Sequence, residues 1–236
     1  MQRNINNLIG YSMQATDGDI GNVKEFYFDD TKWSVRYLIV QTGNWLSGRE
    51  VLIAPQAIIE TFGIGKKFLV NFNKEKVCNS PDIDTHKPVS GQQEIELYGH
   101  YAWQRYGGSG FYAGGSIGFI TPHPTIDEKI LTEIIDKDKR VDYDVHLRST
   151  SIITGYHIKA LDGEIGHVND FIINDETWQV IYLVIDTHNW VGGKKILIPV
   201  THIKDIQWEN SKVVIDETIT TIKDSIVFDE SKFIEQ

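Results

Sequence analysis

The fold is decided by a stretch that occurs twice in this chain, first as Ala15-Thr16-Asp17-Gly18-Asp19-Ile20-Gly21 and again as Ala160-Leu161-Asp162-Gly163-Glu164-Ile165-Gly166. The same offset of 145 residues relates further glycine, aromatic and aliphatic positions on both sides of the stretch. These pairs include Gly10/Gly155, Tyr11/Tyr156, Phe26/Phe171, Trp33/Trp178, Tyr37/Tyr182, Trp45/Trp190 and Leu52/Leu197. Agreement at so many positions indicates a duplicated structural unit.

Each copy has the sequence pattern of short β-strands. Asp17-Gly18 and Asp162-Gly163 stand between apolar runs and predict two-residue hairpin turns, in which both turn positions favour positive φ. Residues 33–40 are apolar on both faces, so they should form a central, buried strand. Other strands are expected over residues 23–28, 51–53 and 68–72 of the first copy.

Five or six short strands in each copy predict a mainly β protein made of two small antiparallel β-barrels. A short helix should follow each barrel, with Asn73 as the N-cap in the first copy and residues 216–225 in the same place in the second. The predicted boundaries are 1–81 for the first barrel, 82–145 for a linker and 146–236 for the second barrel.

The long linker over residues 82–145 is rich in glycine and aromatic residues, and we expect most of it to be poorly structured. Residues 97–119 cannot build a core of their own, yet their aromatic side chains are costly to leave in water. They therefore either pack back on a barrel or contact another protein.

Apolar residues on one helical face predict a short amphipathic helix over 127–135 that docks on a barrel. The polar face of this helix is acidic, which argues against a role at a membrane surface.

The composition excludes several classes of protein. A hydrophobic fraction of 41% and a charged fraction of 24% are typical of a globular protein. The chain contains no apolar run of membrane-spanning length, and its single cysteine, Cys78, suits a reducing compartment, so we expect a cytoplasmic protein without membrane insertion. Residues 151–236 carry 7 basic and 14 acidic side chains, which disfavours nucleic-acid binding.

The sequence lacks the patterns that carry catalysis. It has no nucleophile elbow, no phosphate-binding loop and no paired-histidine helix motif, so we expect no enzyme activity, no catalytic residue and no cofactor. His157, His167, His188 and His202 all lie in the second copy. Their spacing matches no usual set of metal ligands, and no metal site is expected, but a small-ligand or metal sensor in this histidine-rich copy is the alternative function.

Acidic residues recur at equivalent positions of the two copies. These pairs are Asp17/Asp162, Asp19/Glu164, Glu25/Asp170 and Asp30/Asp175. Asp17 and Asp30 should lie in turns, where carboxylates accept hydrogen bonds from nearby backbone amides, and the others should point outward from the strands. A cation site or an acidic docking face is the functional alternative.

Large aromatic residues are the candidates for binding a partner. Trp33 should belong to the core, whereas Trp45 lies in a loop bounded by glycines, where its indole either caps one end of the barrel or contacts a partner. Capping is favoured because both copies keep this tryptophan. The candidate partner-binding residues are Tyr98, Tyr101, Trp103, Tyr106, Trp45 and Trp190.

One run of residues resembles the PRC-barrel, the module at the core of the photosynthetic reaction-centre H subunit. The run comprises Gly10-Tyr11, Asp17-Gly18-Asp19-Ile20-Gly21-Asn22-Val23, Phe26-Tyr27-Phe28-Asp29-Asp30, Trp33 and Val35-Arg36-Tyr37-Leu38-Ile39-Val40, and it recurs over residues 155–185. The resemblance implies a tandem PRC-barrel protein acting as a non-enzymatic scaffold or adaptor that binds a protein partner, in reaction-centre-like or stress-related assemblies. It identifies a fold more than an activity, and it specifies neither the partner nor the oligomeric state.

Overall fold

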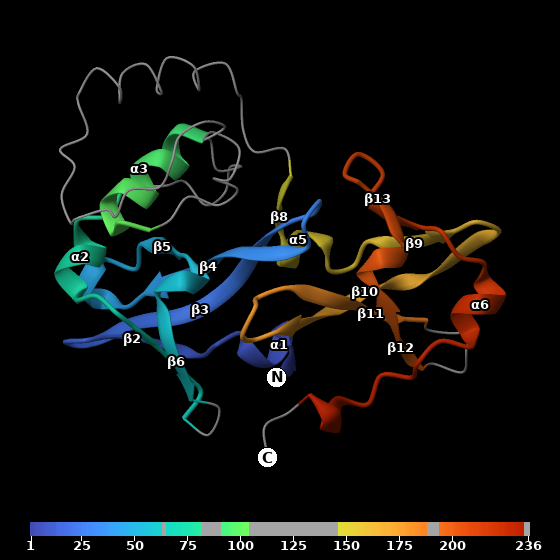
Figure 1. Cartoon of the computed structure of the whole chain (residues 1–236), viewed down its shortest axis with the longest axis horizontal. Coiled ribbons are helices and arrows are strands. Elements are labelled where there is room, and N and C mark those ends of the chain that lie inside the picture. The colour runs from blue at the N-terminus through green and yellow to red at the C-terminus, as the bar shows by residue number, and fades with distance from the viewer. Residues whose placement is uncertain (63–64, 82–90, 104–145, 188–193, 234–236) are drawn as a thin grey trace, which may run out of the picture.

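The computed structural model describes residues 1–62, 65–81, 91–103, 146–187 and 194–233. Within these ranges the chain is mainly β, with two seven-stranded sheets of mostly antiparallel strands and a few short helices (Figure 1). No helix in these ranges combines the length and the apolar character needed to cross a membrane.

The first sheet is formed mainly by the first copy and has the strand order β5-β4-β3-β2-β7-β6. Its strands are β2 (Ser12–Ala15), β3 (Gly18–Asp29), β4 (Ser34–Thr42), β5 (Glu50–Ile53), β6 (Ile58–Phe62) and β7 (Lys67–Val70). The β2–β7 pairing is parallel and the others on this path are antiparallel. β4 is buried along nearly its whole length between β3 and β5, which confirms the predicted central strand.

The second sheet repeats this arrangement in the order β12-β11-β10-β9-β14-β13. Its strands are β9 (His157–Ala160), β10 (Gly163–Asn174), β11 (Val180–Asp186), β12 (Lys195–Pro199), β13 (Ile203–Gln207) and β14 (Lys212–Ile215). Here too the pairing of β9 with β14 is parallel. The duplication seen in the sequence is therefore a duplication of sheet topology.

The prediction of two β-barrels is not confirmed. In the first sheet the end strands β5 and β6 follow each other in the chain through a short 3₁₀ turn, η2 (Pro55–Ala57), and in the second β12 and β13 are joined in the same way by η3 (Val200–His202). Among the described strands β5 does not pair with β6, nor β12 with β13. The hydrogen-bonded pairing of each sheet is thus interrupted between its two end strands, at the 3₁₀ turn that connects them.

The two predicted hairpins are present, but their turns lie one residue earlier than expected. Ala15 pairs with Gly18, so the turn residues are Thr16 and Asp17, and the turn of the second hairpin is shifted in the same way. The expectation of positive φ at both turn positions is wrong, because neither Thr16 nor Asp17 is left-handed. The glycine instead opens the following strand, at a φ of +142° for Gly18.

Glycine is indispensable at Gly21 and Gly166, where neighbouring strands approach closely. A Cβ atom at Gly21 would lie 2.0 Å from the backbone oxygen of Gln41, and one at Gly166 would lie 2.0 Å from the backbone oxygen of Asp186. No real Cβ contact is that short, so any side chain at these two positions would force the strands apart.

The short helix expected after each sheet is present. α2 (Lys74–Cys78) begins after Asn73, whose side chain accepts a hydrogen bond from the Lys76 amide at 3.0 Å, as predicted for an N-cap. α6 (Ile219–Lys223) lies within the range predicted for the second copy. The Asp17 carboxylate accepts from the Lys74 amide at 2.8 Å, so it ties the hairpin to α2 rather than bracing its own turn.

A further helix, α3 (Gly91–Tyr101), lies within the segment expected to be poorly structured. Its two glycines are at position 91 and near its end at position 99, so its interior has ordinary helix formers, and Leu97, Tyr98 and Tyr101 follow the three- and four-residue spacing of a helix face. The amphipathic helix predicted over 127–135 lies outside the described residues.

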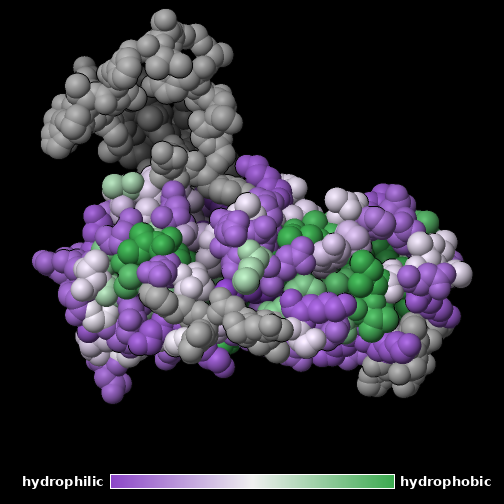
Figure 2. Space-filling model, turned by 60° about the horizontal axis from the view of Figure 1, so that its bottom comes forward, coloured by the Kyte–Doolittle hydropathy of each residue, from purple (hydrophilic) through white to green (hydrophobic). Residues whose placement is uncertain are grey.

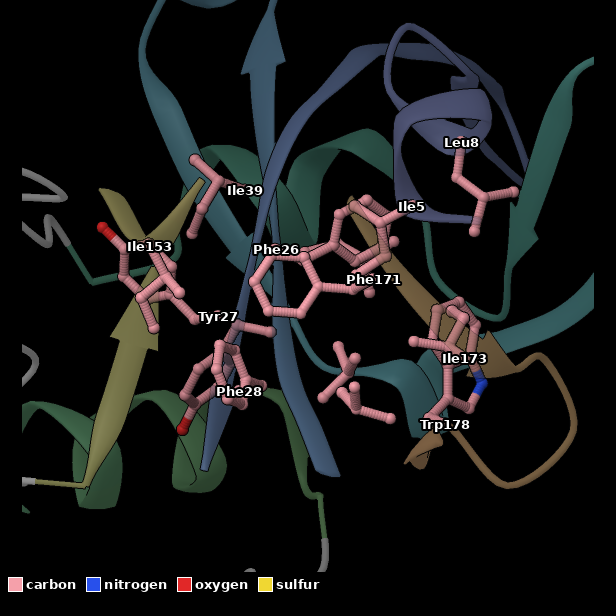
Figure 3. Close-up of a cluster of buried hydrophobic side chains, with 14 of the residues drawn as sticks. Ile5, Leu8, Phe26, Tyr27, Phe28, Ile39, Ile153, Phe171, Ile173 and Trp178 are labelled. Atoms are coloured by element: carbon pink, nitrogen blue, oxygen red, sulfur yellow. The ribbon is translucent and has the colours of Figure 1, made fainter. Parts of the chain in front are cut away.

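The hydrophobic core runs continuously through both copies. Phe28 of β3 packs on Phe171 of β10 with ring centroids 5.5 Å apart, and Phe26 lies 6.5 Å from Trp178. Figure 3 shows Ile5, near the start of the chain, beside Phe26 and Phe171 in this cluster. The two sheets therefore bury part of their apolar surface against each other.

Candidate functional site

Two short segments cross from one copy to the sheet of the other. The first arm, residues 1–9, contains β1 (Gln2–Asn4) and α1 (Ile5–Leu8), and β1 pairs antiparallel with β10 of the second sheet. The second arm, residues 146–154, contains β8 (Leu147–Ser149) and α5 (Thr150–Ile153), and β8 pairs with β3 of the first sheet (Figure 1). Each sheet thus obtains its seventh strand from the other copy.

The two arms bind in the same way. Arg3 lies opposite Ile173 and Arg148 lies opposite Phe28, which are equivalent registers at the offset of 145 residues. Arg3 Nε donates to the Asp175 carboxylate at 2.5 Å, and Arg148 Nε donates to Asp30. Burial works to raise the pKa of Asp175, but the hydrogen bond from Arg3 and the other charge contacts outweigh it, so this pKa is lowered.

A second pair of carboxylates binds each arm where its strand passes into its short helix. Asp170, which is 3% exposed, accepts from the Asn4 side-chain amide at 2.9 Å and from the backbone amide of Asn6 at 3.1 Å. Burial raises the pKa of Asp170 to about 6, although these hydrogen bonds work in the opposite direction. At the equivalent position Glu25 accepts from the hydroxyls of Ser149 and Ser151.

The expectation for two of the four acidic pairs shared by the copies is therefore corrected. Asp30 and Asp175 were expected to brace nearby turns, and Glu25 and Asp170 to point outward, yet all four receive the arm of the other copy. The sequence contains the missing signal: Arg3 and Arg148 are related by the same offset as the acidic residues that they bind. The short-range sequence pattern alone predicts that these carboxylates contact residues of their own copy.

The hairpin tips of the two copies also meet through their backbones. Val180 N donates to the Trp33 carbonyl at 2.7 Å, and Val35 N donates to the Trp178 carbonyl at 2.8 Å. Both tryptophans have positive φ, 51° for Trp33 and 58° for Trp178. Trp178 is buried, while Trp33 is partly buried and stacks on Phe28 at 5.4 Å, so the indoles belong to the region between the sheets.

α3 covers the outer face of the first sheet, where it places two of the candidate partner-binding residues. Tyr98 packs edge-on against Tyr37 of β4 at 6.3 Å, and Tyr101 packs against Phe72 at 4.9 Å. Tyr98 and Tyr101 are each only 6% exposed, so both contact their own sheet. Trp103 follows the helix, is partly buried, and stacks on Tyr101 at 4.2 Å with nearly parallel rings.

An ion pair fastens α3 to this sheet. Glu94 binds the guanidinium of Arg36 and accepts a hydrogen bond of 2.6 Å from the Tyr37 hydroxyl. Arg36 is itself buried in β4, where its guanidinium lies 4.0 Å from the buried Asp29 carboxylate, and Glu94 of the helix adds a second and closer counter-charge. Burial also raises the pKa of Tyr37 well above its ordinary value, and it raises that of Tyr101 to about 12.

A different segment covers the equivalent face of the second sheet. We call residues 226–233 the tail segment. Phe228 and Phe233 of this segment stack on each other with ring centroids 5.3 Å apart and cover Ile172, Val184 and Leu197. The positions equivalent to these three in the first copy are Tyr27, Ile39 and Leu52, which lie in the same buried cluster as Tyr98 and Tyr101 of α3.

The other candidate aromatic residues have different positions. Trp45 in η1 (Asn44–Leu46) is partly buried against the core, donates from Nε1 to the Ile20 carbonyl at 2.7 Å, and has the Lys74 ammonium 4.3 Å from its ring centroid. Such contacts match the capping interpretation of this loop. Tyr106 and Trp190 lie outside the described residues.

The histidines of the second copy do not form one cluster in the part of the chain that is described. His157 of β9 and His167 of β10 are direct cross-strand partners, but His202 binds Glu217 at 2.9 Å, and His188 lies outside the described residues. No group of three histidine, cysteine or acidic side chains within the described ranges could hold a metal ion.

The family model described as the PRC-barrel domain matches residues 1–79 and 159–222, which is more than half of the chain. A search of curated proteins finds no significant match.

Proposed function

Because this chain belongs to the PRC-barrel domain family, as a tandem protein with two copies, we propose that it is a non-enzymatic scaffold or adaptor that binds a protein partner in the cytoplasm. The family resemblance makes reaction-centre-like and stress-related assemblies the first partners to test. The proposal does not include nucleic-acid binding or membrane insertion, in keeping with the acidic second copy.

One observation carries this proposal. The equivalent outer faces of the two sheets are apolar, and each is covered by a segment that is not part of the repeat, α3 in the first copy and the tail segment in the second. A duplicated module whose outer faces are covered by unrelated segments has the organisation of a scaffold, in which the shared core gives rigidity and the added segments give specificity.

The titratable groups support a structural role. Asp170 and Tyr37 have raised pKa values, and such groups often mark catalytic sites. Here Asp170 binds the first arm and Tyr37 binds Glu94 of α3, so each is used in a contact between two parts of the chain. These contacts account for the burial that shifts both pKa values without invoking a reaction.

Trp103 is the described linker residue that best suits a contact with a partner. Its indole is partly buried at the end of α3, and tryptophans of this kind are frequent among residues that dominate the energy of an interface. Trp103→Ala should reduce recovery of the partner in affinity purification from native lysate by about tenfold, as the loss of a single dominant contact does.

The matched control is Leu161→Ala, because Leu161 is 64% exposed and lies in the hairpin turn of the second copy. Both variants should keep the circular dichroism spectrum of the unaltered protein, and Trp103→Ala should lower the melting temperature only slightly because it removes one stacking contact with Tyr101. Equal recovery of the partner with both variants would show that this end of α3 is not the contact surface. The scaffold proposal itself fails if the unaltered protein retains no specific protein partner.

A further inference from the structure

We propose that the outer face of the second sheet, together with the edge of β12, is a docking site for an extended, aromatic-anchored segment of a partner protein, and that the chain's own tail segment occupies this site until such a partner displaces it. We call it the tail site, formed by Ile172, Tyr182, Val184, Leu197 and the backbone edge of β12. The inference rests on the proposed scaffold function and names the surface that would perform it.

The tail segment binds β12 as an added strand would. Leu197 N donates to the Ile226 carbonyl at 2.9 Å, and Phe228 N donates to the Lys195 carbonyl at 2.8 Å, around an antiparallel bridge between Ile196 and Val227. β12 is otherwise the end strand of its sheet, so its outer backbone groups can accept an extended segment of any sequence. Main-chain hydrogen bonds of this kind supply affinity without demanding particular residues.

Two aromatic side chains supply the anchors. Phe228 and Phe233 are brought together because Asp229 caps the intervening turn, η4 (Glu230–Lys232), and accepts from the Ser231 amide at 3.2 Å. Ile226 and Val227, in contrast, are 63% and 51% exposed. The tail segment is therefore held by two rings and a short stretch of backbone pairing, which is a small contact for a permanent element.

The first copy provides an internal comparison for this site. There the equivalent face is covered by α3, a helix that is fastened by the Glu94–Arg36 ion pair. The second copy has Ile181 in place of Arg36 and therefore offers no such charge for a covering segment. The equivalent faces of the two copies are thus covered by segments that share aromatic side chains but differ in secondary structure, which indicates that such a face recognises aromatic anchors and not one particular sequence.

The charge of the second copy indicates which partner would displace the tail segment. Residues 151–236 carry 14 acidic and 7 basic side chains, and the tail segment itself contains Asp229, Glu230 and Lys232. A partner segment with two aromatic residues about five positions apart and more basic residues than the tail segment would keep the anchors and add attraction to the net negative charge of the second copy. Figure 2 shows hydrophobic residues reaching the surface in separate patches over both halves of the molecule, each surrounded by hydrophilic residues.

A labelled synthetic peptide with the sequence of residues 224–233 is the probe. The full chain with Phe228→Ala and Phe233→Ala cannot hold its own tail segment, so it should bind this peptide in a fluorescence anisotropy titration. The unaltered chain should bind the peptide at least about tenfold more weakly because its site is occupied. A peptide in which both phenylalanines are replaced by alanine should bind neither protein.

A second peptide tests the predicted partner chemistry. It keeps both phenylalanines and the capping Asp229 but has lysine in place of Asp224 and Glu230, and it should bind the double variant more tightly than the native sequence at low salt and lose this advantage at high salt. Tyr182→Lys in the double variant should weaken both peptides, because Tyr182 lies in the tail site.

The inference is overturned if the double variant is folded by circular dichroism and binds neither phenylalanine-containing peptide. If the double variant does not fold, hydrogen exchange of the unaltered chain decides. Faster exchange at the Leu197 and Phe228 amides than along the β10–β11 ladder supports a displaceable tail segment, and equal protection overturns it. These measurements use purified protein and peptide alone, so their failure leaves the scaffold proposal, which is tested in lysate, unaffected.

Discussion

At the scale of single residues, equivalent positions of the duplicated chain have acquired different physical chemistry. Asp170 and Glu25 each receive the arm of the other copy, but Asp170 is bound by the Asn4 amide and by backbone amides, whereas Glu25 is bound by the hydroxyls of Ser149 and Ser151. Asn4 Oδ1 is buried without a hydrogen-bond partner among the described residues. If the Asn4 side-chain amide rotates, a protonated Asp170 can donate a hydrogen bond to this oxygen. The contact between the first arm and Asp170 is therefore compatible with an uncharged Asp170 carboxyl group.

This chemistry predicts that stability decreases as the pH rises from about 4 to about 6. The pKa of Asp170 is raised by burial from 3.8 to about 6, so in this range the folded protein holds a proton that the unfolded chain has released. The corresponding stability, about 3 kcal/mol, is fully present below pH 4 and is lost as the pH rises through 6. Asp170→Asn should remove this part of the pH dependence.

Urea unfolding of both proteins at pH values between 4 and 7 measures this effect. The difference in unfolding free energy between D170N and the unaltered protein should move in favour of the variant as the pH rises through this range. Hydrogen exchange in residues 1–9 should show the same trend if Asp170 acts on the first arm. Parallel stability profiles for the two proteins would contradict the assignment.

At the scale of secondary-structure elements, the reciprocal arms are the feature that joins the two copies. β1 and β8 each complete the sheet of the other copy, and each is held by an arginine on a carboxylate. The Arg3 and Asp175 side chains are 8% and 12% exposed, so this pair lies largely out of water. Removal of Arg3 leaves the largely buried Asp175 with the exposed N-terminal ammonium of Met1, 2.6 Å from its carboxylate, as its remaining counter-charge.

Arg3→Ala should therefore destabilise the protein by about 2 kcal/mol, the loss expected for a charged hydrogen bond, with the largest loss of hydrogen-exchange protection in residues 1–9. Lys24→Ala is the control, because Lys24 forms its ion pair with Glu50 on the exposed surface and should change stability by less than about 1 kcal/mol. Thermal and urea unfolding measure both variants. Equal effects of the two substitutions would show that the first arm does not depend on its buried pair.

At the scale of the whole molecule, the two copies share strands, core residues and hairpin contacts. The Trp178 ring lies 6.5 Å from Phe26 and 6.0 Å from Phe68, both in the first copy, and the hairpin tips exchange backbone hydrogen bonds. Neither sheet has its full set of strands without the other copy. The molecule should therefore behave as one cooperative unit.

Unfolding should accordingly occur in a single transition that far-ultraviolet circular dichroism and tryptophan fluorescence report at the same midpoint. Phe68→Ala removes a fully buried ring from the first copy, and it should lower the midpoint for both copies together by destabilising the protein by about 3 to 5 kcal/mol. Two separate transitions, or loss of the first copy alone in the variant, would show that the copies fold independently.

Much of the local structure was predictable because it depends on short-range pattern. The repeat, the two hairpins, the central strand β4 and the Asn73-capped helix follow from turn residues, apolar runs and caps that lie within a few positions of one another. The Asp-Gly pattern predicts the turn one position too late, because Gly18 opens a strand rather than completing its turn. Local pattern does not predict α3, because glycines follow it closely in the sequence and its stability comes from Tyr37, Phe72 and Arg36 of a sheet far away in the sequence.

The sequence by itself determined that this protein is a duplicated, mainly β molecule of the PRC-barrel domain family, because duplication and turn chemistry are written in consecutive residues. Only the tertiary structure decided which copy each arm completes, where Glu25, Asp30, Asp170 and Asp175 are used, and which segments cover the outer faces of the sheets. The physical reason is that the backbone N–H and C=O groups of an arm strand, β1 or β8, could pair equally well with either of the two sheets. The choice between the two sheets depends on buried carboxylates and aromatic rings that meet only after the chain has folded.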